Sequence, residues 1–411
     1  MKVAIVHDWL TGMRGGERCL QAFLRLYPQA DVFALLHVPG ATSAEIDSHV
    51  RGTSFLQKLP GVKRFYRLAL PLYPAAVRGF RFEGYDFVIS LSHSAVKNIR
   101  VPQGVPHVCY CFTPMRYIWD QAENYFGRGT ALVWPVLQAL RSWDLEGGMR
   151  PDVIVAISSF VAARIRCFYE REAEVIYPPV DTSWVSPAGE GEKGQAFLYA
   201  GALVPYKRVD LVVDAFNRLG EPLWVVGRGP EEKALRRMAG ASIRFLGPVP
   251  DADLAGYYRR CRALVFPGKE DFGLIPIECQ AAGRPVVGLH HGGLKETLNG
   301  VMPWQHHKPE VRLVPPLGLF EASARRVDAS GVFIPTTRRG DRARRLEALL
   351  TSLRYFIEHE DEFRPEACIL QAHKFRPTRF YCAWNSMLMR NGLGRFVSPR
   401  VSEMLAAANA E

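Results

Sequence analysis

The residues best suited to chemistry lie in one short segment in the second half of the chain. Glu270 and Glu278 are eight positions apart, the first in a glycine-containing turn after a predicted strand and the second about one turn inside the next predicted helix. Both carboxylates can therefore reach the crevice that the backbone amides near Phe272 and Gly273 face. Amides at a helix start bind phosphate or sugar oxygens, whereas carboxylates repel phosphate and accept hydrogen bonds from hydroxyl groups. The pattern indicates a site for a sugar or ribose.

Two basic residues begin a predicted helix earlier in the same half. Lys207 and Arg208 follow a predicted strand and precede a helix from Val209. A cation at a helix start interacts unfavourably with the helix dipole. A bound phosphate would explain this misfit, and the alternative is a pair of solvated charges. A further turn, 227–230, contains Arg228 and leaves backbone exposed after the next strand.

A glycine-containing turn also follows the first predicted strand. It runs over 11–18 and contains Gly15 and Gly16 just before a helical pattern. Glycines at a strand-to-helix turn let the backbone approach a phosphate, and the helix start adds donors. The turn lacks the G-x-G-x-x-G spacing of dinucleotide-binding folds, so on its own it is a weak signal for a phosphate site and favours a structural turn.

Short apolar runs that alternate with helical patterns predict an α/β fold with parallel sheets. The predicted strands are Val3–His7, Val32–Leu36, Phe87–Leu91, Val108–Phe112, Val153–Ile157, Phe197–Ala200, Leu223–Val226, Ile243–Leu246, Ala263–Phe266 and Pro285–Leu289. Two doubly wound, Rossmann-like domains facing a cleft follow from this pattern, with binding residues beyond the carboxyl ends of the strands. The expected divisions are an N-terminal domain at 1–180, a linker at 181–194, a C-terminal domain at 195–376 with an atypical insertion at 299–330, and a C-terminal helix and tail at 377–411.

Charge and composition narrow the range of partners. The chain of 411 residues has 52 basic and 41 acidic residues, a formal net charge of +11, which favours an anionic partner. No nucleic-acid motif is present, so we expect no nucleic acid. Its eight cysteines show neither a zinc pattern nor a disulfide scaffold. With no signal-peptide pattern and no apolar run of about 18 residues, a cytoplasmic location is expected.

Residues 51–82 are basic and contain no acidic residue. The basic positions alternate with aromatic and aliphatic ones, a pattern typical of a surface that lies on anionic lipid. The alternative is an ordinary pair of helices with a solvated basic face, and the sequence does not choose between them. The first interpretation predicts a peripheral protein on the inner face of the cytoplasmic membrane.

Several motifs in order resemble one enzyme family. The spacing of Glu270 and Glu278, with Pro276 between them and the run 282–287 behind them, is similar to family 4 retaining glycosyltransferases of GT-B fold. The other matching pieces are His7–Arg18, Cys111–Tyr117, Tyr177–Asp181 and Val204–Arg208. Together they most resemble bacterial mannosyltransferases that build O-antigen and exopolysaccharide. The likeness spans about residues 1–298 and resumes around 331–335.

The resemblance implies a role for each matching residue. Glu270 lies by the donor sugar, Glu278 binds the nucleotide ribose and Lys207 binds phosphate. The backbone amides of Phe272, Gly273 and Leu274 contact sugar and phosphate. Gly15 and Gly16 line the diphosphate. The implied reaction transfers a hexose, mannose from GDP-mannose, to a lipid-linked saccharide. The C-terminal helix crosses back onto the first domain. No cofactor is implied, and without an Asp-x-Asp motif no metal is expected.

Two residues depart from the family pattern. The family usually has an arginine at the position of Ala202 and, in this branch, a histidine at the position of Phe112. Losing one charged donor to a phosphate weakens transition-state stabilisation by about a few kcal/mol unless another cation replaces it. Arg208, Arg228 or Arg14 are candidates for that replacement. The alternative is a degenerate, non-catalytic sugar-nucleotide-binding or partner subunit.

Overall fold

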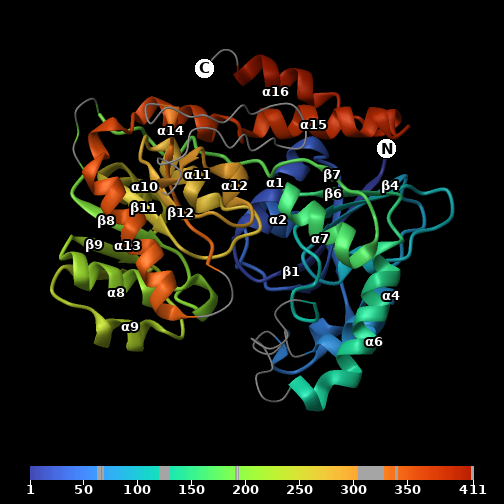
Figure 1. Ribbon diagram of the computed structural model, residues 1–411. Helices are drawn as coiled ribbons and strands as arrows, with labels where there is room; N and C mark the ends of the chain where they lie inside the picture. Colours follow the sequence, from blue (N-terminus) through green and yellow to red (C-terminus); the bar gives the residue numbers. More distant parts are fainter. Residues whose placement is uncertain are drawn as a thin grey trace. The chain divides into compact units, whose positions relative to one another are not determined.

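The computed structural model describes residues 1–62, 66, 69–119, 130–189, 192, 194–303, 328–337 and 341–408. These residues form two compact units (Figure 1). Unit 1 comprises Met1–Pro179 and Pro377–Glu411, and unit 2 comprises Val180–Arg376. Among the described residues, no helix combines the length and the apolar character that a membrane span requires.

The described strands of unit 1 form one parallel sheet in the order β3-β2-β1-β4-β5-β6-β7. The strands are β1 (Val3–Leu10), β2 (Asp31–His37), β3 (Val50–Thr53), β4 (Phe87–Ser92), β5 (His107–Cys111), β6 (Val153–Ala156) and β7 (Glu174–Val175). The helices are α1 (Gly15–Leu26), α2 (Ala44–His49), α4 (Tyr73–Arg78), α6 (Thr130–Gly148), α7 (Ser159–Tyr169), α15 (Pro377–Arg390) and α16 (Arg400–Ala408). The strand order runs outward in one direction from β1 and in the other from β4, so the sheet is doubly wound and its switch point lies between these two strands.

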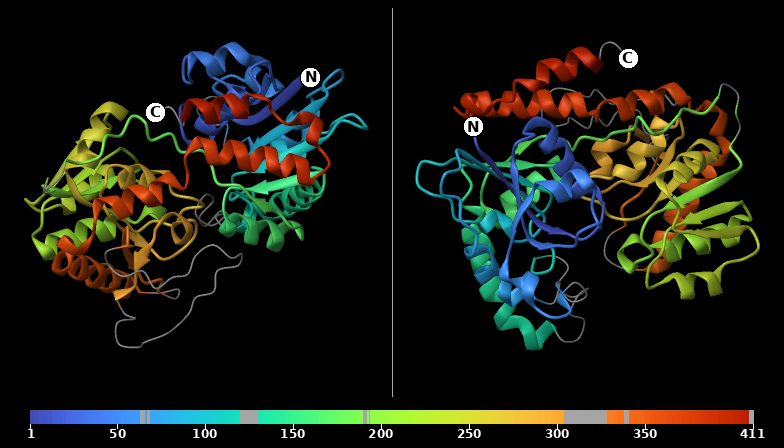
Figure 2. Two further views of the ribbon diagram at one scale, coloured as in Figure 1. Left: turned by 90° about the horizontal axis from the view of Figure 1, so that it is seen from above. Right: turned by 180° about the vertical axis from the view of Figure 1, so that it is seen from behind.

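The C-terminal helix α15 packs against α1 of the same unit (Figure 2). The ring of Phe23 on α1 meets Phe380 and Trp384 on α15 edge to face, with centroids 5.2 and 4.7 Å apart. The indole nitrogen of Trp384 donates a 2.9 Å hydrogen bond to the hydroxyl of Tyr27. Edge-to-face aromatic pairs add about 0.5–1.5 kcal/mol to the burial of their surface. The predicted return of the C-terminal helix to the first domain is confirmed.

Unit 2 has the same doubly wound plan, with the described strands in the order β10-β9-β8-β11-β12-β14-β13. The strands are β8 (Ala196–Ala200), β9 (Leu223–Val226), β10 (Ile243–Gly247), β11 (Cys261–Phe266), β12 (Val286–Leu289), β13 (Gly300–Val301) and β14 (Gly331–Ile334). The helices are α8 (Val209–Leu219), α9 (Glu232–Met238), α10 (Asp251–Arg260), α11 (Leu274–Ala281), α12 (Leu294–Thr297), α13 (Arg342–Glu358) and α14 (Pro365–His373). Here the switch point lies between β8 and β11.

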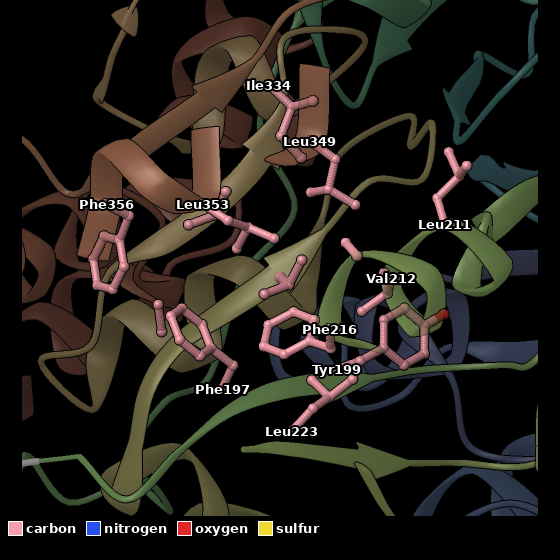
Figure 3. Packing of buried hydrophobic residues seen from close by; sticks show 14 of the residues in the cluster. Phe197, Tyr199, Leu211, Val212, Phe216, Leu223, Ile334, Leu349, Leu353 and Phe356 are labelled. Carbon is pink, nitrogen blue, oxygen red and sulfur yellow. The ribbon is translucent and has the colours of Figure 1, made fainter. Parts of the chain in front are cut away.

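Helices α8 and α13 cover one face of the unit 2 sheet (Figure 3). Phe216 on α8 and Phe356 on α13 both meet the ring of Phe197 on β8, with centroids 5.1 and 5.7 Å apart. All three side chains are fully buried. Removing one such ring from a packed core costs about 3–5 kcal/mol, so this cluster holds the sheet on which the site is built.

All ten predicted strands are present, and the predicted α/β class with two doubly wound domains is confirmed. The sequence did not predict β3, β7, β13 or β14, which have two to four residues each. Strand β1 continues to Leu10, beyond the predicted end at His7. Much of the predicted insertion at 299–330 lies outside the described residues.

The basic segment 51–82 contains several short elements in its described part. These are the last residues of β3, the 3₁₀ turns η1 (Phe55–Lys58) and η3 (Leu70–Leu72), and α4. Many of its apolar side chains are buried in the core of unit 1: Leu56, Tyr66, Leu70 and Tyr73. Arg51, Lys58, Arg78 and Arg81 are exposed. Lys63, Arg64 and Arg67 lie outside the described residues.

Candidate functional site

The switch point of unit 2 brings Lys207 and Glu270 together. Lys207 ends the 3₁₀ turn η6 (Pro205–Lys207) that follows β8, and Glu270 lies in the loop after β11. The Lys207 ammonium forms an ion pair with the Glu270 carboxylate, and both side chains are largely buried, at 12% and 20% exposed. The ammonium also lies 5.1 Å from the centroid of the Phe266 ring. Lys207, predicted to bind phosphate, and Glu270, predicted to lie by the donor sugar, are therefore in direct contact.

Two glycines hold the loop that carries Glu270. Gly292 has φ +67°, and a Cβ there would lie 2.1 Å from the Glu270 carbonyl oxygen. The next residue, Gly293, donates its amide to the same carbonyl at 2.9 Å. Any side chain at Gly292 would displace the loop. The turn at Gly292 and Gly293 thus positions the Glu270 backbone rather than forming a separate site.

The helix α11 supplies the predicted amides and the second carboxylate. Gly273 has φ +106°, a left-handed conformation that glycine adopts without strain, and it allows α11 to begin directly at Leu274. The first amides of a helix have no acceptor within it and can bind an anion. The ring of Phe272 packs on Phe375, with centroids 5.4 Å apart, so only the Phe272 backbone is suited to a ligand.

Glu278 is buried on the same helix and has an internal partner. Glu278 is only 6% exposed to solvent. Its Oε2 atom accepts a 2.9 Å hydrogen bond from the hydroxyl of Tyr258, which lies on α10. No sequence pattern pointed to Tyr258, because a tyrosine among the apolar positions of a helix is typical of the core.

Arg208 and Arg228 do not join the Lys207–Glu270 pair in any contact that the structure defines. Arg208 adopts a left-handed conformation with φ +57° and donates two 3.0 Å hydrogen bonds to Asp210. That ion pair explains the cation at this helix start without a phosphate. Arg228 is exposed, and its carbonyl accepts a 3.0 Å hydrogen bond from the Leu203 amide. Donor binding by either arginine remains a prediction.

The glycine turn of unit 1 lies beside a buried histidine. Helix α1 begins at Gly15, and a Cβ on Gly16 would lie 3.2 Å from Nε2 of His7. Burial lowers the pKa of His7 to about 3, so its ring is neutral. Glu17 follows and accepts a 3.1 Å hydrogen bond from the Arg14 amide. The turn is thus closely packed against His7 at Gly16, where a larger side chain would need its neighbours to shift.

The two departures from the family pattern are visible in the structure. Ala202 is exposed, and its carbonyl accepts a 3.1 Å hydrogen bond from the Tyr199 hydroxyl. Phe112 follows β5, and its ring centroid lies 6.3 Å from those of both His7 and His93. Apolar side chains therefore occupy both positions at which the family usually has a cation or an imidazole.

The structure also reveals polar residues that the sequence did not single out, Asp8 and His93. Both lie near the switch point of unit 1, and the only sequence signal was an aspartate within an apolar strand. Among the residues that the structure describes, no group of three or more His, Cys, Asp or Glu side chains has an arrangement that could hold a metal ion.

Two family descriptions match successive parts of the chain. Residues 13–184 match the description Glycosyltransferase Family 4, and residues 194–316 match Glycosyl transferases group 1. The first match lies in unit 1 except for its last residues, 180–184, and the second covers the first part of unit 2.

Curated relatives align with parts of the chain. A D-inositol 3-phosphate glycosyltransferase of Frankia alni is 33% identical over 30% of this chain and 37% of its own length. A GDP-mannose-dependent phosphatidylinositol monomannoside mannosyltransferase of Mycobacterium tuberculosis is 27% identical over 44% of this chain and 53% of its own length. An O-antigen chain mannosyltransferase C of Escherichia coli is 33% identical over 23% and 28%. The chain spans about half or less of the length of these relatives.

Solved structures share the fold over nearly the whole chain. Anabaena Alr3699/HepE in complex with UDP aligns with a TM-score of 0.63 and 16% identity, covering 95% of this chain and 100% of that one. Sucrose-phosphate synthase of Thermosynechococcus elongatus aligns with a TM-score of 0.64 and 16% identity, covering 95% and 98%. The fold is GT-B. Together with the family matches, it supports assignment to the GT-B glycosyltransferases of family 4.

Proposed function

We propose that this chain transfers a hexose from a nucleotide sugar with retention of configuration, and that the donor is GDP-mannose. The observation that carries the proposal is the Lys207–Glu270 ion pair at the switch point of unit 2, beside the start of α11. A cation and helix-start amides suit a diphosphate, and a carboxylate suits sugar hydroxyls. The mannosyltransferases among the relatives support mannose as the sugar.

In the proposed reaction, the bond between the anomeric carbon and the phosphate oxygen breaks, and the acceptor oxygen bonds to that carbon on the same face. The acceptor proton passes to the departing phosphate. Lys207 and the amides at Leu274 stabilise the charge that develops on the leaving group. Without a ligand, Lys207 neutralises Glu270; on donor binding, the ammonium turns to the phosphate and the carboxylate accepts hydroxyl hydrogen bonds.

The proposed acceptor is a lipid-linked saccharide, reached from the inner face of the cytoplasmic membrane. Exposed Phe55 and Leu72 support this, because they lie in the same basic segment as the exposed residues Lys58, Arg78 and Arg81. Aromatic and aliphatic side chains enter the interface, and each basic residue near an anionic surface adds about 1 kcal/mol. Replacing Lys58, Arg78 and Arg81 by Gln should reduce binding to phosphatidylserine vesicles, whereas replacing the exposed Lys233 and Arg237 on α9 should not.

The proposed function is tested by calorimetric titration with GDP, UDP, ADP and their sugars, followed by transfer assays with detergent-solubilised membrane lipid. Selective binding of GDP-mannose with transfer to lipid is the expected result. Glu278→Ala should weaken nucleotide binding, while Glu366→Ala, an exposed glutamate on α14, should leave it unchanged. A chain that binds none of the nucleotides would contradict the proposal.

A second candidate function is a non-catalytic subunit that binds a sugar nucleotide. The apolar side chains at Ala202 and Phe112 favour it, since a charged donor and an imidazole are missing there. Binding of nucleotide sugar without transfer to any lipid-linked saccharide, and without hydrolysis of the donor, would favour this candidate. Restoring the family residues with Ala202→Arg and Phe112→His should then create activity.

A further inference from the structure

Three polar side chains meet at the switch point of unit 1. His7 and Asp8 lie toward the end of β1, and His93 directly follows β4. In open parallel α/β sheets, ligands bind beside the carboxyl ends of the strands where the strand order reverses. The same place in unit 2 holds the Lys207–Glu270 pair. The topology therefore places the group in unit 1 where ligands bind in such sheets, and its contacts show which side chain a ligand can reach.

The carboxylate of Asp8 fixes the turn that carries His93. Asp8 is fully buried, and its two oxygens accept hydrogen bonds of 2.6 to 3.0 Å from the four successive amides of His93, Ser94, Ala95 and Val96. Its Oδ2 also lies 3.3 Å from Nδ1 of His93. The ring of Trp9 meets the imidazole edge-on, with centroids 4.4 Å apart. The orientation of His93 is thus set from two sides.

A second buried charge holds the same turn. The ammonium of Lys97 donates a 2.7 Å hydrogen bond to the Ser94 carbonyl and forms an ion pair with Asp144. Asp144 also accepts 2.8 Å hydrogen bonds from the Trp119 indole and the Tyr169 hydroxyl. Buried ion pairs are often no more stabilising than apolar side chains of the same size. Stability therefore does not explain the arrangement, whereas a rigid support for a ligand-contacting side chain does.

His93 is the member of this group that a ligand can reach. Its side chain is 25% exposed, whereas that of Asp8 is fully buried and His7 is 1% exposed. The partly buried ring of Phe112 lies beside it, with centroids 6.3 Å apart. An imidazole next to an apolar ring suits a sugar, since hydroxyl groups hydrogen-bond to the imidazole and the C–H face of a pyranose packs on the ring.

We propose that His93 binds a hydroxyl group of a pyranose ring at the carboxyl end of the unit 1 sheet, and that Asp8 is its positioning residue. This inference rests on the proposed function, in which the protein holds two sugars, one on the nucleotide and one on the acceptor. Both present the same hydroxyl chemistry, so the experiment is built to separate them.

Two variants of His93 separate ligand contact from support of the turn. His93→Asn keeps an amide near the Nδ1 position, beside Asp8, and lacks a group at the Nε2 position. His93→Gln carries its amide out to the Nε2 position. The measurements are the Kd of GDP, the Kd of GDP-mannose and the KM of the lipid-linked acceptor, with UDP and UDP-glucose as a second nucleotide pair.

We expect His93→Asn to leave the Kd of GDP unchanged, because no nucleotide contact is assigned to His93. If the donor sugar is bound, the Kd of GDP-mannose rises about tenfold; if the acceptor sugar is bound, the acceptor KM rises about tenfold, as the loss of one hydrogen bond requires. His93→Gln should recover part of the loss. His37→Asn is the control, because His37 is also paired with a carboxylate, with 2.8 Å between its Nε2 and Asp47.

Two results would overturn the inference alone. In the first, the wild-type chain transfers sugar and His93→Asn has the same Kd for GDP-mannose and the same KM for the acceptor. In the second, His93→Asn loses as much affinity for GDP as for GDP-mannose. The second result would mean that His93 only supports the fold. A wild-type chain that binds no nucleotide sugar would instead overturn the proposed function, and this inference with it.

Discussion

The hydroxyl of Tyr258 donates a 2.9 Å hydrogen bond to Oε2 of Glu278, joining helices α10 and α11 inside unit 2. Both side chains are buried. Burial raises the pKa of Tyr258 well above its usual range, and the charge of Glu278 raises it further, so the phenol keeps its proton and remains a donor. The carboxylate thus has one oxygen fixed by the protein, which orients the other.

Tyr258→Phe removes this hydrogen bond and keeps the ring. If Glu278 binds the ribose, the variant should bind GDP about three- to tenfold more weakly, because Tyr258 acts on the nucleotide only by orienting Glu278 and the effect is about that of one ordinary hydrogen bond. It should also discriminate less between GDP and its 2′-deoxy and 3′-deoxy forms. Calorimetry with the three nucleotides measures both effects.

The matched control is Tyr110→Phe in unit 1, where a buried tyrosine donates a 2.9 Å hydrogen bond to the Ile176 carbonyl. It should lose stability without any change in nucleotide affinity. Unchanged discrimination between ribose and deoxyribose in Tyr258→Phe would show that Tyr258 does not act through Glu278.

Lys207→Ala should reduce turnover by about tenfold or more, because a cation that stabilises a departing diphosphate acts mainly in the transition state. Loss of Lys207 also leaves Glu270 without its counter-charge, so donor binding should weaken. Steady-state kinetics with the donor varied measure both effects, and Lys233→Ala, an exposed lysine of the same unit, should be neutral. A variant with wild-type turnover would remove Lys207 from the phosphate site.

The sequence predicted the sheets because their strands are buried, apolar and bounded by turn residues. It also predicted where Lys207 and Glu270 lie, since residues that follow neighbouring parallel strands meet at one edge of the sheet. Two of the four missed strands, β7 and β13, have only two residues each, too few to show a pattern. The other two, β3 and β14, have four residues, as the predicted β6, β9 and β12 do, but β3 contains Arg51 and Gly52 instead of an apolar run. What a side chain contacts depends on packing between distant segments, so neither the Lys207–Glu270 ion pair nor the Tyr258–Glu278 hydrogen bond had a sequence signal.

Asp8 also shows that contacts between distant segments cannot be predicted from local sequence. A carboxylate within an apolar run indicates the end of a strand, since burying a lone charge is costly. In the structure β1 continues past Asp8 because amides 85 to 88 residues away satisfy the carboxylate. Such long-range compensation cannot be read from local sequence. It also explains why His93, which the same amides position, did not stand out.

Glu17→Gln should change the pH dependence of stability. Burial raises the pKa of Glu17 from 4.5 to about 7. Between these values the folded chain holds a proton that the unfolded chain has lost, so stability falls as pH rises through this window, by up to about 3 kcal/mol. The variant should be close to wild type at pH 4.5 and more stable at pH 8, as measured by urea unfolding.

Glu146→Gln, an exposed glutamate of α6, should keep the wild-type pH profile. If Glu17→Gln shows the same profile as wild type, the Glu17 carboxyl ionises as easily in the folded chain as in the unfolded one.

Lys97→Met should destabilise unit 1 by about 3–5 kcal/mol, because it leaves the buried carboxylate of Asp144 without its counter-charge. Adding Asp144→Asn removes that charge while keeping an acceptor for the Trp119 and Tyr169 hydrogen bonds. The double variant should therefore lose less than the sum of the single losses, and a double-mutant cycle in urea measures the difference. Additive losses would mean that the two charges do not interact. Because Lys97 also holds the Ser94 carbonyl, the single and the double variant, which both lack this lysine, should weaken sugar binding at His93 even where the fold survives.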